Sequence, residues 1–360
     1  MIRNATVRTP EESAAVRRRG ERRARLALLR LLACASILRT ALTRLVPMAG
    51  CGAWWLTLLC LLPGAAVYAV LSWLLYRTGT ATLTELLRRC VGRGGATLMN
   101  VLLGTALLTE GLADMTALIT LFTEGVGTRG TQWTLALLTG GVLACCLHRE
   151  GLARGAYLLR PVLLGAAALL AVCALPGLRA DGLFPMLGEG LPAAQAVLHT
   201  GWSLAWPLLL LLTLPEERGR ARLRDACPVA TLTVAALLLL TLTLPHERLT
   251  EAASFAGRLL QPARHASNAL RMLWQCLLML TLFLAVAASA RLSADLLAAS
   301  ARRETPWLPW AVLAALTLSQ TFPSAVLVQA LNAVQVWQLL PFAVLTALCV
   351  PNAIVRRKSP

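Results

Sequence analysis

Lysine is almost absent from this sequence, and charge of either sign is scarce. Lys358 is the only lysine, and charged residues make up 14% of the 360 residues, where soluble domains carry about 25%. Arginines nevertheless outnumber acids, and the net charge is +17. They occupy short loops between apolar stretches instead of forming one basic surface, as membrane topology requires. The sequence therefore predicts a lipid membrane and no nucleic acid as its surroundings.

Motifs for catalysis and metal binding are also missing from the sequence. It contains no GxSxG, HExxH or P-loop pattern, its ten cysteines include no CxxC, and its four histidines are isolated. We expect no enzymatic activity, no catalytic residue, no metal and no cofactor. The first 25 residues have no apolar core, so we also expect no cleavable signal peptide.

Apolar residues make up 57% of the chain, and the mean hydropathy is +0.67. These values predict an all-α polytopic membrane protein with about ten transmembrane helices. A basic cytoplasmic tail (1–25) would precede a membrane domain (26–350), and a second cytoplasmic tail (351–360) would follow it. The predicted spans are 26–48, 54–76, 96–122, 132–147, 158–175, 201–214, 227–244, 270–290, 307–322 and 334–350.

The distribution of basic residues predicts the orientation of these spans. The tails and loops on one side hold 25 of the 34 basic residues, and the loops on the other side hold five. Because cytoplasmic loops carry the excess of arginine and lysine, both termini are predicted to be cytoplasmic.

The sixth stretch, 181–216, is too short in its apolar part to cross a membrane alone. Fourteen helical residues rise about 21 Å, against a hydrocarbon core of about 30 Å. The glycine- and proline-containing segment before it would supply the remainder, and loose backbone at a half-helix end is how several transporter folds build a substrate site. The alternative is a tilted short helix after an ordinary loop.

The strongest set of charged residues within the predicted spans has three members. Arg39 interrupts the first span, and Glu110 and Asp114 lie four residues apart on one face of the third. Because an unpaired charge in the membrane is costly, we predict that Arg39 pairs with Glu110 or Asp114. Such a pair would serve either to hold two helices together or to line a ligand or ion pathway.

These residues lead to a predicted ligand-binding cavity. Ser36 and Arg39 from the first span, Thr109, Glu110 and Asp114 from the third, and Gly201, Trp202 and Trp206 from the sixth would form its wall. Free N–H groups at a helix start favour a carboxylate, and the acidic face favours an ammonium or a coupling cation. Alternatively, Arg39 neutralises the acids and fills the pocket, and the tryptophans serve only for packing.

Several stretches resemble the spore germination permease family, the GerAB-like B subunits of nutrient germinant receptors, in the amino acid/polyamine/organocation (APC) superfamily. They are AWWLTLLCLLPG and TGTATLTELLRRCVG in and after the second span, FPMLGEGLPAAQAVLHTG and PEERGRARL around the sixth, and ARHASNALRMLWQ before the eighth.

This resemblance implies two inverted five-helix repeats with broken first and sixth helices. It also implies a permease-like subunit that binds a small, amino acid-like nutrient in a mid-membrane pocket and signals or releases ions. The implied partners are a larger membrane A subunit and a lipoprotein C subunit, in the spore inner membrane or the cell membrane. A free-standing secondary transporter of amino acids or organic cations, and a degenerate scaffold subunit that does not transport, remain as alternatives.

Overall fold

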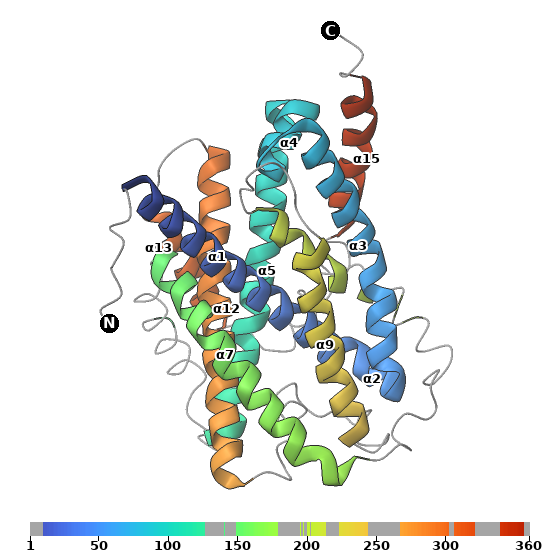
Figure 1. Ribbon diagram of the computed structural model, residues 1–360, viewed down its shortest axis with the longest axis vertical. Coiled ribbons are helices and arrows are strands. Elements are labelled where there is room, and N and C mark those ends of the chain that lie inside the picture. Colours follow the sequence, from blue (N-terminus) through green and yellow to red (C-terminus); the bar gives the residue numbers. More distant parts are fainter. Residues whose placement is uncertain are drawn as a thin grey trace, which may run out of the picture.

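A computed structural model describes residues 10–126, 140, 149–178, 195, 197, 200–201, 203–213, 223–243, 267–301, 306–320 and 339–355. Every element within these residues is a helix, and none of them forms a strand, which confirms the all-α prediction (Figure 1). The elements are α1 (Pro10–Thr40), η1 (Ala41–Leu45), α2 (Val46–Ala49), η2 (Gly50–Gly52), α3 (Ala53–Thr78), α4 (Leu83–Cys90), α5 (Arg93–Val126), α7 (Arg149–Ala174), η3 (Leu175–Gly177), η5 (Trp206–Thr213), α9 (Leu223–Thr243), α12 (Asn268–Ala301), α13 (Leu308–Ser319) and α15 (Leu339–Val355).

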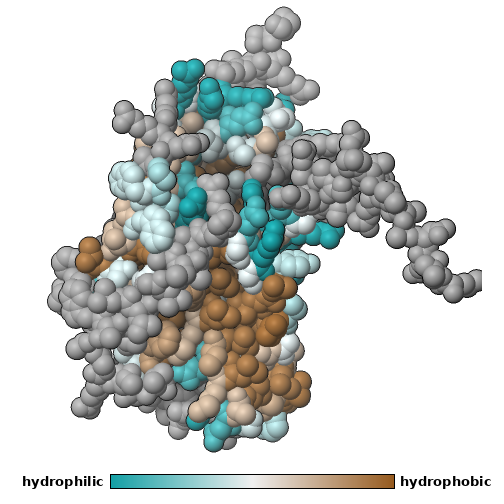
Figure 2. Space-filling view, turned by 90° about the vertical axis from the view of Figure 1, so that its left-hand side faces the viewer, coloured by the Kyte–Doolittle hydropathy of each residue, from teal (hydrophilic) through white to brown (hydrophobic). Residues whose placement is uncertain are grey.

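The composition of these helices makes the chain an α-helical membrane protein. Five helical stretches of the described residues are long and apolar enough to cross a membrane: 20–78, 93–123, 150–174, 226–243 and 268–301. Large apolar side chains remain exposed on their outer faces, such as Leu62 on α3, Leu158 on α7 and Met272 on α12. Figure 2 shows apolar residues over the lower half of the molecule and hydrophilic residues above them. An exposed apolar surface of this extent fits contact with lipid.

The first of these stretches, 20–78, folds back on itself. Gly50 has a φ of 52°, a conformation that glycine adopts without steric cost, and it stands where α2 ends. α1 descends to this point and α3 rises from it, so the stretch forms two antiparallel passes (Figure 1). α1 begins at Pro10, well before the predicted start of the first span at residue 26. Arginine, alanine and glutamate are good helix formers, which explains this extension of the helix into the basic tail.

A short amphipathic helix, α4, connects α3 to α5. Its N-cap Thr82 accepts a hydrogen bond from the Glu85 backbone N–H at 3.2 Å, and Leu83, Leu86 and Leu87 are buried. α5 then runs antiparallel to α3, back across the molecule (Figure 1).

α5 and α12 pack closely in an antiparallel pair. A Cβ added to Gly104 would lie 3.0 Å from Leu297 Cγ, and one added to Gly111 would lie 3.0 Å from Ser289 Cβ. Ser293 Oγ also donates a hydrogen bond to the Gly104 carbonyl at 2.8 Å. Small residues at such an interface let two membrane helices approach closely. This pairing fixes the position and rotation of the helix that carries both buried acids.

Residues 200–213, which we call span six, occupy the centre of the bundle. The side chains from Ser203 to Leu212 are all buried. A Cβ added to Gly64 of α3 would lie 2.5 Å from the Ala205 backbone oxygen, and one added to Gly201 would lie 3.7 Å from Cys60 Cα. Gly201 contacts Cys60, and Ala205, four residues later, contacts Gly64, four residues after Cys60. The contacts therefore advance in the same direction along both helices, which run parallel.

The described helices overlap nine of the ten predicted spans, with boundaries that differ by up to sixteen residues. The predicted fourth span (132–147), apart from residue 140, lies outside the described residues, as does most of the segment 181–199 that precedes span six.

Candidate functional site: a buried charge cluster

Arg39 forms ion pairs with both acids of the third span. Its Nε donates a hydrogen bond to Asp114 Oδ1 at 2.7 Å, and its second guanidinium nitrogen, Nη2, pairs with Glu110 Oε2. The three side chains are only 6%, 0% and 2% exposed, in the order Arg39, Asp114 and Glu110. The structure therefore confirms the predicted pairing and extends it to a triad, in which one guanidinium joins α1 to two turns of α5.

Glu110 accepts hydrogen bonds from three side chains, two on α1 and one on η5. Ser36 Oγ, one turn before Arg39 on α1, donates to Oε2 at 2.6 Å, and Trp206 Nε1 of η5 donates to Oε1 at 3.2 Å. With the Arg39 guanidinium, three side-chain donors therefore converge on this carboxylate. Glu110 is the point at which α1, α5 and span six meet.

Asp114 is satisfied on one side only. Its Oδ1 accepts from Arg39, whereas Oδ2 is buried and has no hydrogen-bond partner within the described residues. Nearby on α1, the Thr40 hydroxyl is buried and likewise has no partner among them. Buried polar atoms without partners are rare in native proteins, and they mark places where a water, a proton or a ligand group can bind.

The backbone of the first span changes its helix type immediately after Arg39. Residues Ala41–Leu45 form a π-helical segment, in which the Val46 N–H bonds to the Ala41 carbonyl. Pro47 explains the change, because a proline has no N–H for the carbonyl four residues earlier and its ring collides with it. Thr43 Oγ1 donates to the Arg39 carbonyl at 2.8 Å, which satisfies the backbone at this point. Single-turn π-helical segments occur frequently at functional sites.

Span six also departs from regular α-helix where it meets the cluster. Residues Trp206–Thr213 form a 3₁₀-helix, which begins at the residue whose indole binds Glu110. Pro207 follows directly and has no N–H to donate to an α-helical ladder. A 3₁₀-helix rises about 2.0 Å per residue against about 1.5 Å in an α-helix, so these eight residues span about 16 Å instead of about 12 Å. The short apolar run of span six thereby gains length.

Trp206 connects the cluster to the last helix. Its ring stacks on Phe342 of α15, with ring centroids 6.5 Å apart and an interplanar angle of 15°. Both side chains are fully buried. The indole thus offers its N–H to Glu110 and its face to Phe342, which holds it in one orientation.

The structure places the eight predicted site residues in three groups. Five of them meet in the charge cluster: Ser36, Arg39, Glu110, Asp114 and Trp206. Thr109 and Gly201 lie elsewhere: the Thr109 hydroxyl donates to the Ala106 carbonyl of its own helix at 2.8 Å, and Gly201 packs against Cys60 of α3. Trp202 lies outside the described residues.

The prediction from sequence did not include Phe342 or Gly64 in the site, although it bounded the cavity by residues 36–40 of the first span. The proline at 47, downstream of two threonines, could have indicated an irregular turn near Thr40. Nothing in the spacing of residues around Phe342 or Gly64 distinguishes them from other apolar or small residues of membrane helices.

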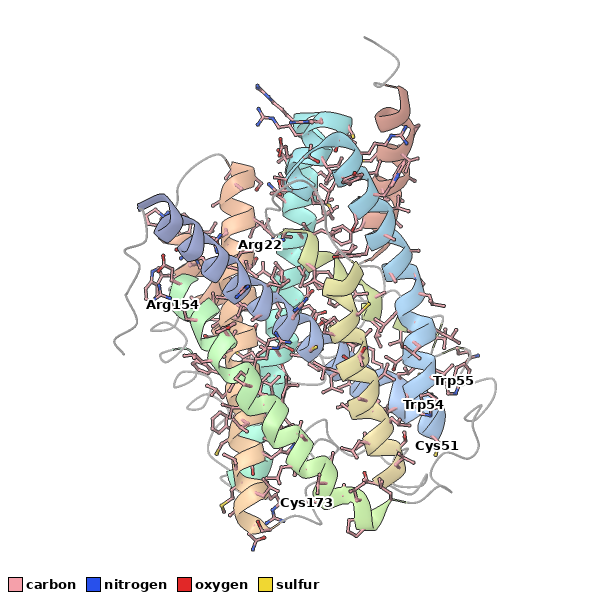
Figure 3. The ribbon with its side chains drawn as sticks, viewed as in Figure 1. Arg22, Cys51, Trp54, Trp55, Arg154 and Cys173 are labelled. Carbon is pink, nitrogen blue, oxygen red and sulfur yellow. The ribbon has the colours of Figure 1, made fainter. Side chains whose placement is uncertain are left out.

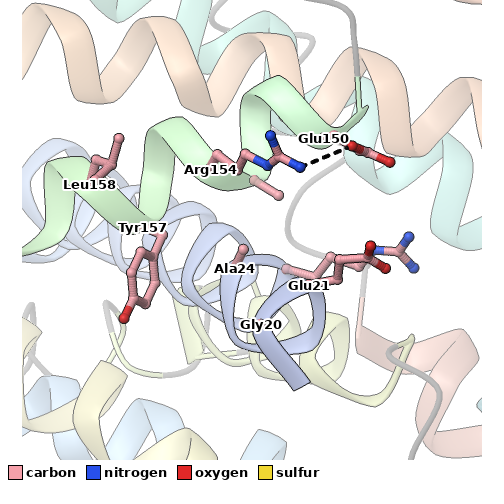
Figure 4. A pocket seen from close by; sticks show the side chains of 9 residues that line it. Gly20, Glu21, Ala24, Glu150, Arg154, Tyr157 and Leu158 are labelled. Atoms are coloured by element: carbon pink, nitrogen blue, oxygen red, sulfur yellow. Dashed lines mark hydrogen bonds and ion pairs between the residues drawn. The ribbon is translucent and has the colours of Figure 1, made fainter. Parts of the chain in front are cut away.

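Cavities that are not lined by any residue of the charge cluster also lie elsewhere among the described helices. One of them, of about 370 Å³, lies between residues 20–25 of α1 and the start of α7 (Figure 4). Its polar walls include Glu21, Arg25 and the exposed pair formed by Arg154 and Glu150, whose nitrogen and oxygen are 3.3 Å apart. Exposed pairs of this kind contribute little to stability. This cavity is a recess with charged walls at the arginine-rich end of the bundle.

No group of three histidine, cysteine or acidic side chains within the described residues is arranged to hold a metal ion. A comparison of the chain with models of known protein families and with curated proteins finds no match.

Proposed function

We propose that this protein is a permease-like membrane subunit that binds a small, amino acid-like nutrient at the Arg39 cluster. The observation that supports this most directly is the position of the cluster. Two acids and one arginine are buried where α1 and α5 meet the start of the 3₁₀-helix of span six, and the π-helical turn of the first span begins two residues after Arg39. Charged residues inside membrane domains are costly and mark ligand or ion sites.

The chemistry of the cluster matches a zwitterion. An amino acid carries an ammonium that can take the place of the Arg39 guanidinium at Asp114, and a carboxylate that can accept from Arg39 in turn. Such an exchange leaves the net charge of the buried site unchanged, so it avoids the cost of adding a bare ion to a low-dielectric interior. The buried Asp114 Oδ2 and Thr40 Oγ1 are the polar atoms ready to receive the incoming groups.

We further propose ten spans in two inverted five-helix repeats, with broken first and sixth helices and both termini in the cytoplasm. The irregular turns of the first and sixth spans support this, as does the parallel contact of α3 with span six. The family resemblance then assigns the chain as the B subunit of a spore germinant receptor. Its partners would be a membrane A subunit and a lipoprotein C subunit.

One observation favours a second candidate, a scaffold subunit that binds no ligand. Glu110 is fully satisfied by donors of the protein itself, and Arg39 pairs with both acids. A cluster of this kind can have a purely structural role, in which it locks α1, α5 and span six together.

Ligand binding separates these candidates. The purified chain in lipid nanodiscs is titrated with each of the common amino acids while its thermal unfolding is followed. A nutrient-binding subunit is stabilised by at least one of them, and Glu110→Gln abolishes that shift. Glu85→Gln, which removes one charge of the exposed Glu85–Arg89 pair, is the matched control and leaves it unchanged. Absence of a shift from every amino acid would leave the scaffold role.

The same protein reconstituted into proteoliposomes distinguishes receptor from transporter. A free-standing transporter accumulates the stabilising amino acid inside the vesicles, whereas a receptor subunit binds it without uptake. Deletion of the gene in the spore-forming host should then abolish germination in response to that amino acid.

A further inference from the structure

A crevice of about 220 Å³ lies over α1, between α7 and α9. Both α7 and α9 pack on α1, and Cys34 Sγ of α1 donates to the Val229 carbonyl of α9 at 3.8 Å, whereas α7 and α9 make no comparable contact with each other. In Figure 1 α7 runs alongside α1 and α9 crosses it. α1 therefore forms the floor of the crevice, and α7 and α9 form its sides.

The crevice opens sideways, toward the surrounding lipid. Leu164 of α7 and Leu232 of α9 line it and are 38% and 42% exposed. Within the apolar window of α7, only 22% of the residues are buried inside the protein, so most of this helix faces outward. A molecule in the bilayer can therefore enter this crevice from the side.

Two arginines stand together at one end of this apolar crevice. Arg30 of α1 and Arg160 of α7 line it, and each precedes the aliphatic wall residues of its own helix, Leu31 and Leu38 on α1 and Leu163 on α7. α1 and α7 run in the same direction, with Arg22 and Arg154 toward one end of the bundle and Cys173 at the other (Figure 3). Both arginines thus lie at the same end of the crevice, and its other end is aliphatic.

Arg160 is exposed and makes no ion pair within the described residues. An arginine on an outward-facing membrane helix requires an anion or water for its guanidinium, and basic pockets between membrane helices are sites for anionic lipid headgroups. The volume is below the range of about 300–1,000 Å³ that encloses a drug-sized ligand, so the site holds only part of its occupant. A lipid fits this description, because its remaining atoms stay in the bilayer.

We propose that this crevice binds an anionic phospholipid, with the phosphate between Arg30 and Arg160 and one acyl chain along the aliphatic wall. Two features of the site support this: guanidinium groups that suit a phosphate, and an apolar groove continuous with the bilayer. This site is separate from the Arg39 cluster and does not depend on the function proposed for that cluster.

Trp274 of α12, which lines the aliphatic end, provides a direct readout. The full-length protein is placed in nanodiscs of zwitterionic lipid that contain a small fraction of lipid brominated on its acyl chains, either phosphatidylglycerol or phosphatidylcholine. The Trp274 signal is the difference in fluorescence between the native chain and Trp274→Phe. Bound anionic lipid should quench this signal several-fold more than the zwitterionic lipid at the same mole fraction.

Variants of the arginines test the charge requirement. Arg160→Gln should reduce quenching by the anionic lipid to the level of the zwitterionic one, and Arg160→Lys should retain most of the preference. Arg154→Gln, on the same helix but outside the crevice, is the matched control and should retain all of it. Ala167→Phe, which fills the groove from α7, should lower quenching by the anionic lipid while both arginines remain. Equal quenching of the native protein by the two lipids, or an unchanged preference in Arg160→Gln, would overturn the proposal.

Discussion

Arg39 Nε and Asp114 Oδ1 are 2.7 Å apart, although 75 residues separate them in sequence. The contact joins α1 to α5 inside the membrane domain, and it shares its guanidinium with Glu110. Removal of one partner from a buried pair leaves the other charge without compensation, at a cost of about 3–5 kcal/mol.

Arg39→Ala should therefore strongly lower the stability and the abundance of the protein. In Arg39→Ala/Asp114→Ala, part of this loss should be recovered, because the uncompensated aspartate is gone as well. The midpoint of thermal unfolding in detergent, measured for both single variants and the double variant, gives the coupling energy. Additive effects would show that the two side chains do not interact.

Glu110 and Asp114 should respond differently to loss of charge. Glu110→Gln keeps one acceptor oxygen for three donors, so at least one of Ser36, Arg39 and Trp206 loses its hydrogen bond. Asp114→Asn still offers an amide oxygen to Arg39 Nε. Because a buried group left unsatisfied costs about 1–3 kcal/mol, Glu110→Gln should be the more destabilised variant. The unfolding midpoints of the two proteins decide this, and the reverse order would contradict the hydrogen-bond assignment.

Gly64 should not tolerate even one added methyl group. A Cβ there would lie 2.5 Å from the Ala205 Cβ and backbone oxygen, so Gly64→Ala must push span six away from α3. Overpacking of this kind costs about 1–3 kcal/mol. Gly165→Ala on α7 is the control, because a Cβ there meets nothing within 4 Å, and it should be neutral or slightly stabilising. Equal unfolding midpoints for the two variants would argue against the close contact.

A cysteine at position 201 should form a disulfide with Cys60. A Cβ on Gly201 would be 3.9 Å from Cys60 Cβ, within the range of about 3.5–4.5 Å found in disulfides. Gly201→Cys, in a background whose other cysteines except Cys60 are replaced by alanine, should cross-link on mild oxidation. Mass spectrometry of the digested protein detects the linked peptides. The same variant with Cys60→Ala added is the control, and failure to cross-link would argue against the parallel packing of α3 and span six.

The two ends of α7 should label from opposite sides of the membrane. Single cysteines at Glu150 and Leu175, both exposed, are treated with a membrane-impermeant maleimide in intact cells and in inside-out vesicles. With the arginine-rich end of the bundle in the cytoplasm, Glu150→Cys reacts only in the vesicles and Leu175→Cys only in the cells. The opposite pattern would reverse the predicted orientation.

The sequence alone determined the helical membrane class and the pairing of Arg39 with the acids of α5. Both depend on free-energy costs that leave few alternatives: apolar stretches of this length must be buried in lipid, and a charge in a membrane must find an opposite charge. With one central arginine and two acids a helical turn apart, the partners could be chosen without knowledge of the packing. The segment around 181–199, on which the predicted half-helix also depended, remains a prediction because most of it lies outside the described residues.

Only the tertiary structure decided which acid became the centre of the cluster. Glu110 and Asp114 are equivalent by spacing, yet Glu110 receives Ser36, Arg39 and Trp206, while one oxygen of Asp114 has no hydrogen bond within the described residues. Only the tertiary structure likewise showed that Trp206 stacks on Phe342 and that Gly201 packs against α3 and not in the cluster. These contacts depend on the rotation and register of helices distant in sequence, and many residues of similar size and polarity could have made them. Close packing selects one arrangement, and it does so only when all the helices are in place.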